Sequence, residues 1–315
     1  MSRSFREKRY LLMKRILSAF LCALLLFSLS SCRREYVDAD PVDPNKLPAV
    51  STPTPEEEDD TVRIYIAGDS TAQTYKNKQN EVQSAEDGTD LMGWGYYLSN
   101  FFSDTVEIHN LAHSGRGTRN YLNTEEYRTL ISDLKEGDWL FIQFAHNDRK
   151  DDGYFTDPNL LLEDVDRSCK TENGVYSYQA CLYYHYIKFA QDRGAKPVLL
   201  SPIALRDPET GLANHSLHTD YIAAAKDLAA NCKIPFVDAA ALTEELYRNL
   251  VEEGGAEATE SLHAFTDESR KERDVTHLSH LGAYTVAELI ANELIQTESL
   301  LAEYAVDFPK PFEKL

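Results

Sequence analysis

The stretch IYIAGDSTAQTY, residues 64–75, joins a run of apolar residues to a polar turn. The run is rich in isoleucine and tyrosine and is typical of a buried strand, and Gly68 ends it. Ser70 follows where the strand ends, which in an open parallel sheet is the edge that binds ligands. Ser70 is therefore a candidate nucleophile. A helix cap is the alternative, because Asp69 and Ser70 both accept hydrogen bonds from the first turn of a helix.

Further apolar runs alternate with helical patterns along the chain. The runs span residues 62–67, 106–111, 139–145, 196–201 and 234–238. Helical spacing of apolar residues covers 93–102, 124–134, 176–193, 220–231, 239–252 and 281–296. This alternation predicts the α/β class, as a three-layer α/β/α sandwich with a five-stranded parallel sheet. No linker or repeat interrupts it, so we expect one domain over residues 61–315.

Polar side chains that suit acyl transfer follow other runs. Gly115 lies in a turn after the second run, and Asn147 follows the third; backbone N–H groups and an Asn amide can both stabilise an oxyanion. Near the C-terminus, Asp274 precedes His277 by three residues. A serine nucleophile needs a histidine base, and the base needs a carboxylate that orients it. Each piece alone also fits an ordinary turn or cap.

Taken together, the blocks resemble those of the SGNH, or GDSL, hydrolases over residues 62 to about 298. IYIAGDSTAQTY, MGWG (92–95), NLAHSGRGTRNY, FIQFAHND and DVTHLSHLGA are similar to blocks of the rhamnogalacturonan acetylesterase-like branch, carbohydrate esterase family 12. The resemblance implies a flavodoxin-like fold and a carboxylic ester hydrolase without a cofactor or metal. It also implies a substrate: O-acetyl groups on a plant cell-wall polysaccharide, with pectic rhamnogalacturonan ahead of xylan.

The same resemblance implies roles for particular residues. Ser70 is the nucleophile, His277 the general base and Asp274 the residue that orients it. The oxyanion is held by the backbone N–H groups of Ser70 and Gly115 and by the side chain of Asn147. Residues expected to line the substrate pocket are Asp69, Arg116 and His146.

Three positions depart from the family pattern. Ala145 stands where glycine is general, Gly117 where serine is common, and His280 where proline is frequent. None of them removes a catalytic group. We expect a methyl group in a tight site at Ala145, and a pocket rim that differs from that of the relatives.

Charge narrows the range of partners. The 315 residues carry 32 Lys and Arg against 52 Asp and Glu, a formal charge of −20. Nucleic acid is excluded as a partner, because phosphate contacts require clustered basic residues. On net charge alone an uncharged or weakly charged substrate fits better, and we expect a monomer that acts on an acetylated polysaccharide or oligosaccharide.

The N-terminus is typical of an exported bacterial protein. Basic residues precede an apolar run, 16–29, which is too short to span a membrane comfortably, and LSSC (29–32) resembles a lipobox. We therefore expect residues 1–31 to be a lipoprotein signal peptide and Cys32 the acylated anchor. An ordinary signal peptide or signal anchor is the alternative. Residues 32–60 are rich in proline and acidic residues and predict a disordered tether.

Three cysteines remain for an oxidising compartment. Cys169 and Cys181 flank a short polar segment and could form a disulfide, whereas Cys232 falls where buried thiols are common. His185 and His263 are interpreted as structural.

Three other functions would fit parts of this sequence. A metal hydrolase could use Asp274, His277 and His280 with His215 and His218, but it leaves Ser70, Gly115 and Asn147 without a purpose. A silent glycan-binding lipoprotein would explain the many tyrosines but not the triad residues. A lipase or thioesterase would keep the triad and change only the acyl substrate.

Overall fold

A computed structural model describes residues 61–77, 79–86, 88–150, 154–156, 160–170, 174–216, 218–297, 299–307, 309–310 and 312. The predictions for the signal peptide, for Cys32 and for the tether fall on residues 1–60 and lie outside the described residues. None of the helices in the described ranges combines the length and the apolar character that a membrane crossing requires.

The five-stranded parallel sheet is confirmed. Its strands are β1 (Val62–Gly68), β2 (Val106–Asn110), β3 (Trp139–Gln143), β6 (Lys196–Leu200) and β9 (Phe236–Val237), in the order β2-β1-β3-β6-β9. Gly68, the last residue of β1, pairs with Gln143, the last residue of β3. The loops that follow these two strands therefore leave the sheet side by side at its carboxyl edge.

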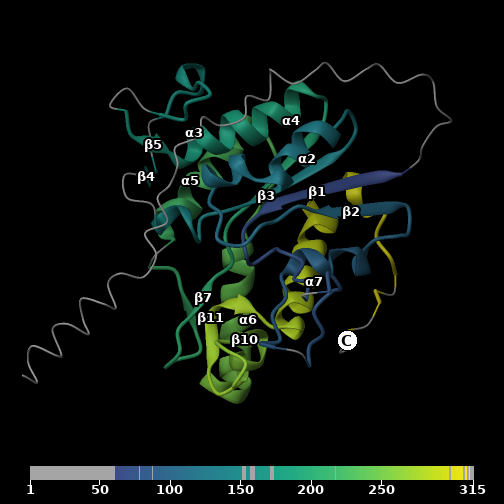
Figure 1. Cartoon of the computed structure of the whole chain (residues 1–315), viewed down its shortest axis with the longest axis vertical. Coiled ribbons are helices and arrows are strands. Elements are labelled where there is room, and N and C mark those ends of the chain that lie inside the picture. Colours follow the sequence, from purple (N-terminus) through teal and green to yellow (C-terminus); the bar gives the residue numbers. More distant parts are fainter. Residues whose placement is uncertain are drawn as a thin grey trace, which may run out of the picture. The chain divides into compact units, whose positions relative to one another are not determined.

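Successive residues of the strands pack into two separate cores, as the alternation of a pleated strand requires. Tyr65 and Ala67 face a core shared with α2 (Glu125–Asp133), α3 (Tyr178–Leu182), α4 (Phe189–Asp192) and α5 (Thr219–Cys232). Ile64 and Ile66 face the second core, shared with α6 (Ala239–Gly254) and α7 (His280–Thr297). Figure 1 shows the two groups of helices on opposite sides of the strands, which confirms the sandwich.

Two of the six helical predictions need correction. Residues 93–102 form two 3₁₀ turns, Trp94–Tyr96 and Leu98–Phe101, closed by bonds from the N–H of Tyr97 to the carbonyl of Trp94 and from that of Phe102 to Ser99. The N–H groups of Gly93, Trp94 and Gly95 bond to the loop after β1. Residues 176–193 begin as a short strand and are helical from Tyr178, with a π-helical stretch at Tyr183–Lys188 between α3 and α4.

Several short elements have no counterpart in the sequence prediction. They are the strand pairs β4 (Tyr154–Phe155) with β5 (Tyr176–Ser177), β7 (Leu205–Arg206) with β8 (Ala213–Asn214), and β10 (His263–Phe265) with β11 (Arg273–Leu278), together with α8 (Ser299–Ala302) and 3₁₀ turns at Asn120–Asn123, Asp148–Lys150, Leu162–Asp164 and Ala256–Leu262. Strands of two or three residues carry too little periodicity to be found from sequence. The pair β10–β11 nevertheless matters most, since β11 carries Asp274 and His277.

Candidate active site

Ser70, His277 and Asp274 form a continuous chain of hydrogen-bonding groups. The Nε2 atom of His277 lies 3.1 Å from the Oγ atom of Ser70, and its Nδ1 atom lies 3.0 Å from the Oδ2 atom of Asp274. Ser70 comes from the loop after β1, and the other two come from β11, more than 200 positions later. The arrangement can activate a serine hydroxyl: His277 can take its proton, and Asp274 can fix the tautomer of the ring.

The carboxylate of Asp274 is held by its own turn. Its Oδ1 atom accepts hydrogen bonds from the backbone N–H groups of Thr276 (2.6 Å) and His277 (2.9 Å). Burial alone would raise the pKa of Asp274, but the hydrogen bonds from the ring and backbone of His277 outweigh burial and hold the pKa well below its ordinary value. Asp274 is therefore ionised throughout the pH range in which His277 could act as a base.

Asp69, next to the nucleophile in sequence, is buried and does not line an open pocket, which corrects the sequence prediction. Its side chain is fully buried, and its Oδ1 atom accepts from the N–H group (3.0 Å) and hydroxyl (2.8 Å) of Thr71. Burial raises the pKa of Asp69 above its ordinary value, although the Thr71 hydrogen bonds act in the opposite direction. Asp69 thus shapes the turn that presents Ser70.

The block MGWG packs against the loop that carries Ser70. The N–H groups of Gly93, Trp94 and Gly95 donate to the carbonyls of Gln73, Thr71 and Ala72 at 2.9, 3.0 and 3.2 Å. A Cβ atom at Gly93 would lie 2.4 Å from backbone atoms of residues 72 and 73, and one at Gly95 would lie 2.7 Å from the carbonyl oxygen of Ala72. Both glycines are therefore required by close approach of two backbones.

Side chains of the nucleophile loop also hold the loop of Gly115. The backbone N–H of Ser114 donates to the side-chain carbonyl of Gln73, and the hydroxyl of Tyr75 donates to the carbonyl of Ser70 at 3.1 Å. Gly115 has a φ of +73°, in the left-handed region that favours glycine. Sequence reasoning missed Gln73 and Tyr75, although both lie within the block that it singled out.

Asn110, the last residue of β2, bonds through its side chain to both the loop of Ser70 and the loop of Gly115. Its amide donates to the carbonyl of Ala72 (2.8 Å) and the hydroxyl of Thr74 (2.9 Å), and its side-chain oxygen accepts from the N–H of Ala112 (3.2 Å). Among the described residues, the N–H groups of Ser70 and Gly115 donate to no carbonyl. Both N–H groups are thus available to a bound acceptor.

Asn147, on the loop after β3, contacts the loop that carries Gly115. Its Nδ2 atom donates to the carbonyl of Arg116 at 3.1 Å, and its Oδ1 atom accepts from the Nζ atom of Lys150 at 3.3 Å. These contacts assign the amide orientation and leave the second Nδ2 hydrogen for another acceptor.

Ala145, two residues before Asn147, has a φ of +132° and is fully buried. The departure from glycine therefore places a methyl group on a strained backbone.

His146 is buried and pairs with His218, which also corrects the expectation of a pocket residue. The two rings meet edge to face with centroids 4.6 Å apart, and both side chains are almost completely buried. Burial, with the nearby charge of Arg149, lowers the pKa of His146 to about 3; burial and His146 lower the pKa of His218 to about 2. Both imidazoles are therefore neutral. Of the three expected pocket residues, only Arg116 is partly exposed.

The structure does not gather the ligands of the alternative metal site. Among the described residues, no group of three or more His, Cys, Asp or Glu side chains has the arrangement of a metal site. His215 lies 2.9 Å from Glu244, His218 contacts His146, and His280 lies 2.8 Å from the hydroxyl of Tyr97. His277 instead contacts the hydroxyl of Ser70.

The other two departures from the family pattern have structural explanations. A Cβ atom at Gly117 would lie 2.8 Å from the carboxylate of Asp148, which is buried and accepts from the N–H and hydroxyl of Thr118. Asp148 therefore occupies the space that a larger residue at 117 would need. His280 is buried at the start of α7, so the expected change at the pocket rim does not arise from this residue.

Cys169 and Cys181 are close together but are free thiols in this structure, so the possible disulfide is not formed. A hydrogen bond with Cys181, together with burial, raises the pKa of the Cys169 thiol well above its ordinary value. Cys232 is also a free thiol. His185 and His263 are buried and bond to neighbouring groups, as their structural interpretation expects.

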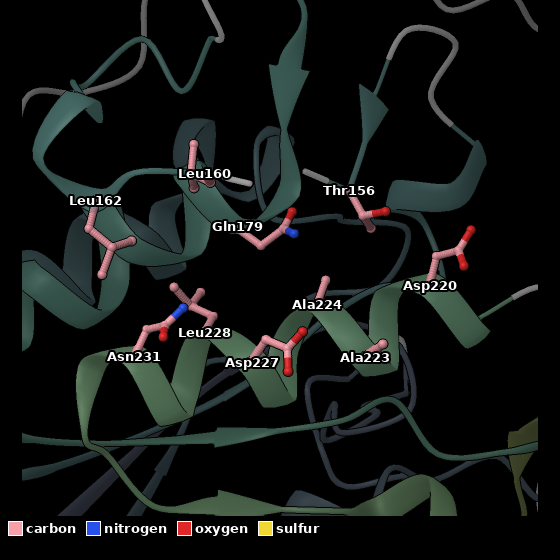
Figure 2. Close-up of a pocket in the computed structure, with 10 residues that line it drawn as sticks. All are labelled: Thr156, Leu160, Leu162, Gln179, Asp220, Ala223, Ala224, Asp227, Leu228 and Asn231. Atoms are coloured by element: carbon pink, nitrogen blue, oxygen red, sulfur yellow. The ribbon is translucent and has the colours of Figure 1, made fainter. Parts of the chain in front are cut away.

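A cavity of about 160 Å³ lies between α5 and residues 156–179. Figure 2 shows Gln179 on one side and Asp220 and Asp227 of α5 on the other. None of the residues singled out from sequence lines this cavity, and it contains no nucleophile paired with a base. The chemistry therefore belongs to the carboxyl edge of the sheet.

The chain is similar to several known proteins. Residues 64–290 match the family described as GDSL-like lipase/acylhydrolase. The chain is 28% identical over 247 residues to a probable rhamnogalacturonan acetylesterase of Bacillus subtilis, covering 76% of this chain and 98% of that protein. It is 27% identical to a second rhamnogalacturonan acetylesterase of the same organism, covering 78% and 94%. The crystal structure of the B. subtilis protein YxiM superposes with a TM-score of 0.55 at 22% identity, covering 75% and 56%.

Proposed function

Because the chain belongs to the GDSL-like lipase/acylhydrolase family and is a carboxylic ester hydrolase, we propose that it removes O-acetyl groups from a plant cell-wall polysaccharide. One observation carries the proposal: the hydroxyl of Ser70 lies 3.1 Å from the imidazole of His277, which in turn bonds to Asp274. Neutral His277 can take the serine proton only in this geometry. The loops beside it supply hydrogen-bond donors for an oxyanion.

The reaction proceeds through an acyl-enzyme. The Oγ atom of Ser70 attacks the ester carbonyl while its proton passes to Nε2 of His277, and the resulting imidazolium is stabilised by Asp274. The tetrahedral intermediate collapses, its C–O bond to the sugar breaks, and His277 gives the proton to the departing sugar oxygen. Water, deprotonated by His277, then attacks the acetyl-serine; the second intermediate expels Oγ of Ser70, which takes the proton from His277, and acetate is released.

The oxyanion of each tetrahedral intermediate is stabilised by three donors. They are the N–H groups of Ser70 and Gly115, and Nδ2 of Asn147. The first two have no acceptor among the described residues, and the third has a hydrogen to spare. Donors held in place before the reaction stabilise developing charge more than water does, because they need no reorganisation.

The substrate class rests on the relatives. Two proteins that align over nearly their full length are described as rhamnogalacturonan acetylesterases, and a third, from Emericella nidulans, is 25% identical and carries the same description. Acetylated pectin is therefore the leading substrate and acetylated xylan the second. A lipase or thioesterase, which would keep the triad, is tested alongside them.

The decisive test measures acetate release from acetylated pectin and xylan by wild type and by Ser70→Ala. Wild type should release acetate, and the variant should lose roughly 10⁴-fold or more in turnover with an unchanged circular dichroism spectrum. Hydrolysis of long-chain acyl esters without acetate release from any polymer would overturn the substrate. Activity that survives in Ser70→Ala but disappears with EDTA would overturn the serine mechanism.

We also propose that the enzyme acts as an exported lipoprotein. The support is the order of basic, apolar and small residues before Cys32 and the proline-rich acidic stretch that follows. Such an arrangement would hold the catalytic domain close to a membrane surface while its substrate remains outside the cell.

A further inference from the structure

The amide of Asn147 can donate to an oxyanion in only one of its two orientations. The oxygen and nitrogen ends of an Asn side chain have nearly the same shape, so hydrogen-bond partners decide which end faces which neighbour. At one end, Nδ2 donates to the carbonyl of Arg116 at 3.1 Å, and a turned amide would place two oxygens together there. A partner that only donates, at the other end of the amide, would exclude the wrong orientation a second time.

Lys150 is that partner. Its Nζ atom lies 3.3 Å from Oδ1 of Asn147, and no other group of the described residues bonds to this oxygen. An ammonium group has three donors and no acceptor, so it can face only the oxygen of the amide. A water molecule in its place both donates and accepts, and would not distinguish the two ends.

The local backbone places Lys150 over Asn147. The N–H of Lys150 donates to the carbonyl of Asn147 at 3.0 Å and closes the one-turn 3₁₀ helix Asp148–Lys150. Such a helix has three residues per turn, so side chains three positions apart lie one above the other. The contact between the two side chains is therefore a consequence of the turn that follows β3.

The positive charge of Lys150 also lies within electrostatic range of the triad. Partial burial, followed by the neighbouring charge of Arg149, lowers the pKa of Lys150. The carboxylates of Asp69 and Asp274 act in the opposite direction on this pKa. A charged donor makes a stronger hydrogen bond than a neutral one, and a donor on the oxygen of an amide polarises the amide, so that its N–H groups donate more strongly.

We propose that Lys150 is a positioning residue for the reaction: its ammonium holds Oδ1 of Asn147, so that Nδ2 keeps its orientation and donates more strongly to the oxyanion. Lys150 acts here on the enzyme and not on the sugar, so its effect should be the same for a polysaccharide and for a small neutral ester. The inference rests on the proposed esterase function and deepens it.

Steady-state hydrolysis of 4-nitrophenyl acetate, which has no sugar and no charge, tests this role. Lys150→Met keeps an unbranched side chain and removes the donor. We expect kcat to fall about tenfold, as for the loss of one hydrogen bond, with little change in KM. Lys150→Arg keeps a charged donor and should recover most of the lost kcat.

A double-mutant cycle separates action through Asn147 from a general effect of charge. When Asn147→Ala is already present, Lys150→Met should cause no further loss of kcat, whereas the losses from independent sites multiply. Lys196→Met is the matched control, because it removes the same charge from the first residue of β6, at the opposite, amino edge of the sheet. The ammonium of Lys196 lies 5.0 Å from the ring of Trp139, and this variant should keep wild-type kcat.

Three outcomes would overturn the positioning role of Lys150 while the esterase proposal stands. They are an unchanged kcat in Lys150→Met, an equal fall with and without Asn147→Ala, and a rise in KM alone, which would mean that Lys150 binds the substrate. Ser70→Ala, measured beside these variants, reports on the proposed function separately. If it kept wild-type turnover, the esterase mechanism itself would be wrong, whatever the result for Lys150.

Discussion

Asn147 is the side chain on which the oxyanion assignment depends most directly. Truncation in Asn147→Ala removes one donor and leaves those of Ser70 and Gly115, so kcat should fall roughly 100- to 1000-fold with little change in KM. Hydrolysis of 4-nitrophenyl acetate measures this. Asn231→Ala, in the wall of the cavity beside α5, should keep wild-type turnover. A reversed result would move the reaction centre to that cavity.

Asp69 gives the fold a pH dependence that an exposed carboxyl group does not. Its pKa is raised by burial above 3.8, so the folded state binds its proton more tightly than the unfolded state does. The contribution of Asp69 to stability should therefore fall as pH rises from about 3.8 through the raised value, and Asp69→Asn should lack this contribution. The stability gained by the variant over wild type should increase from pH 4 to pH 7.

Urea denaturation at several pH values measures this difference. Asp104→Asn is the control, because the side chain of Asp104 is almost completely exposed and its substitution should shift stability little at any pH. A stability difference for Asp69→Asn that is constant with pH would mean that Asp69 titrates alike in the folded and unfolded states.

The segment Met92–Gly95 packs against the nucleophile loop, and its two glycines leave no room even for the methyl group of alanine. In Gly93→Ala, the new Cβ atom would lie 2.4 Å from backbone atoms that cannot move without displacing the Ser70 turn. We expect a loss of about 1–3 kcal/mol in the free energy of unfolding. Turnover should fall by more than the folded fraction explains.

Gly254→Ala provides the comparison for this element. Its Cβ atom would meet only the Cβ atom of Ala258 at 3.0 Å, at the C-terminal end of α6 and away from the nucleophile loop. Measured by chemical denaturation and by single-substrate kinetics, this variant should keep kcat. If Gly93→Ala also kept kcat, the packing of this segment would have no part in placing Ser70.

At the scale of the whole chain, the proposed lipid anchor at Cys32 should determine where the enzyme is located without affecting catalysis. In a bacterial host, wild type should fractionate with membranes, and Cys32→Ala should not be acylated and should lose this association. Specific activity on 4-nitrophenyl acetate should be unchanged, because the residues of the reaction centre begin at Asp69. Labelling with a fatty-acid analogue checks acylation directly; an unlabelled wild type would contradict the lipoprotein prediction.

The fold was predictable because its main signals are local. Five apolar runs in alternation with helical patterns specify a parallel sheet with helices on both faces. Strand periodicity also placed Ser70, Gly115 and Asn147 at the carboxyl edge, because a parallel sheet leaves few positions for the residues that follow its strands. Two helical predictions, for residues 93–102 and 176–193, were wrong because tertiary contacts outweighed the local pattern of apolar residues. The N–H groups of Gly93, Trp94 and Gly95 bond to the loop after β1, and residues 176–193 contain a π-helical stretch.

What the sequence determined by itself is therefore the architecture and the chemical types of the candidate residues. Only the tertiary structure showed that Asp69 and His146 are buried, that His280 pairs with Tyr97, and that Lys150 lies beside Asn147. Burial and partner choice depend on chains of contacts between residues far apart in sequence, which no local pattern contains. The same holds for charge: the sequence gives a net value of −20, whereas the charges near Ser70 depend on which residues the fold brings to it.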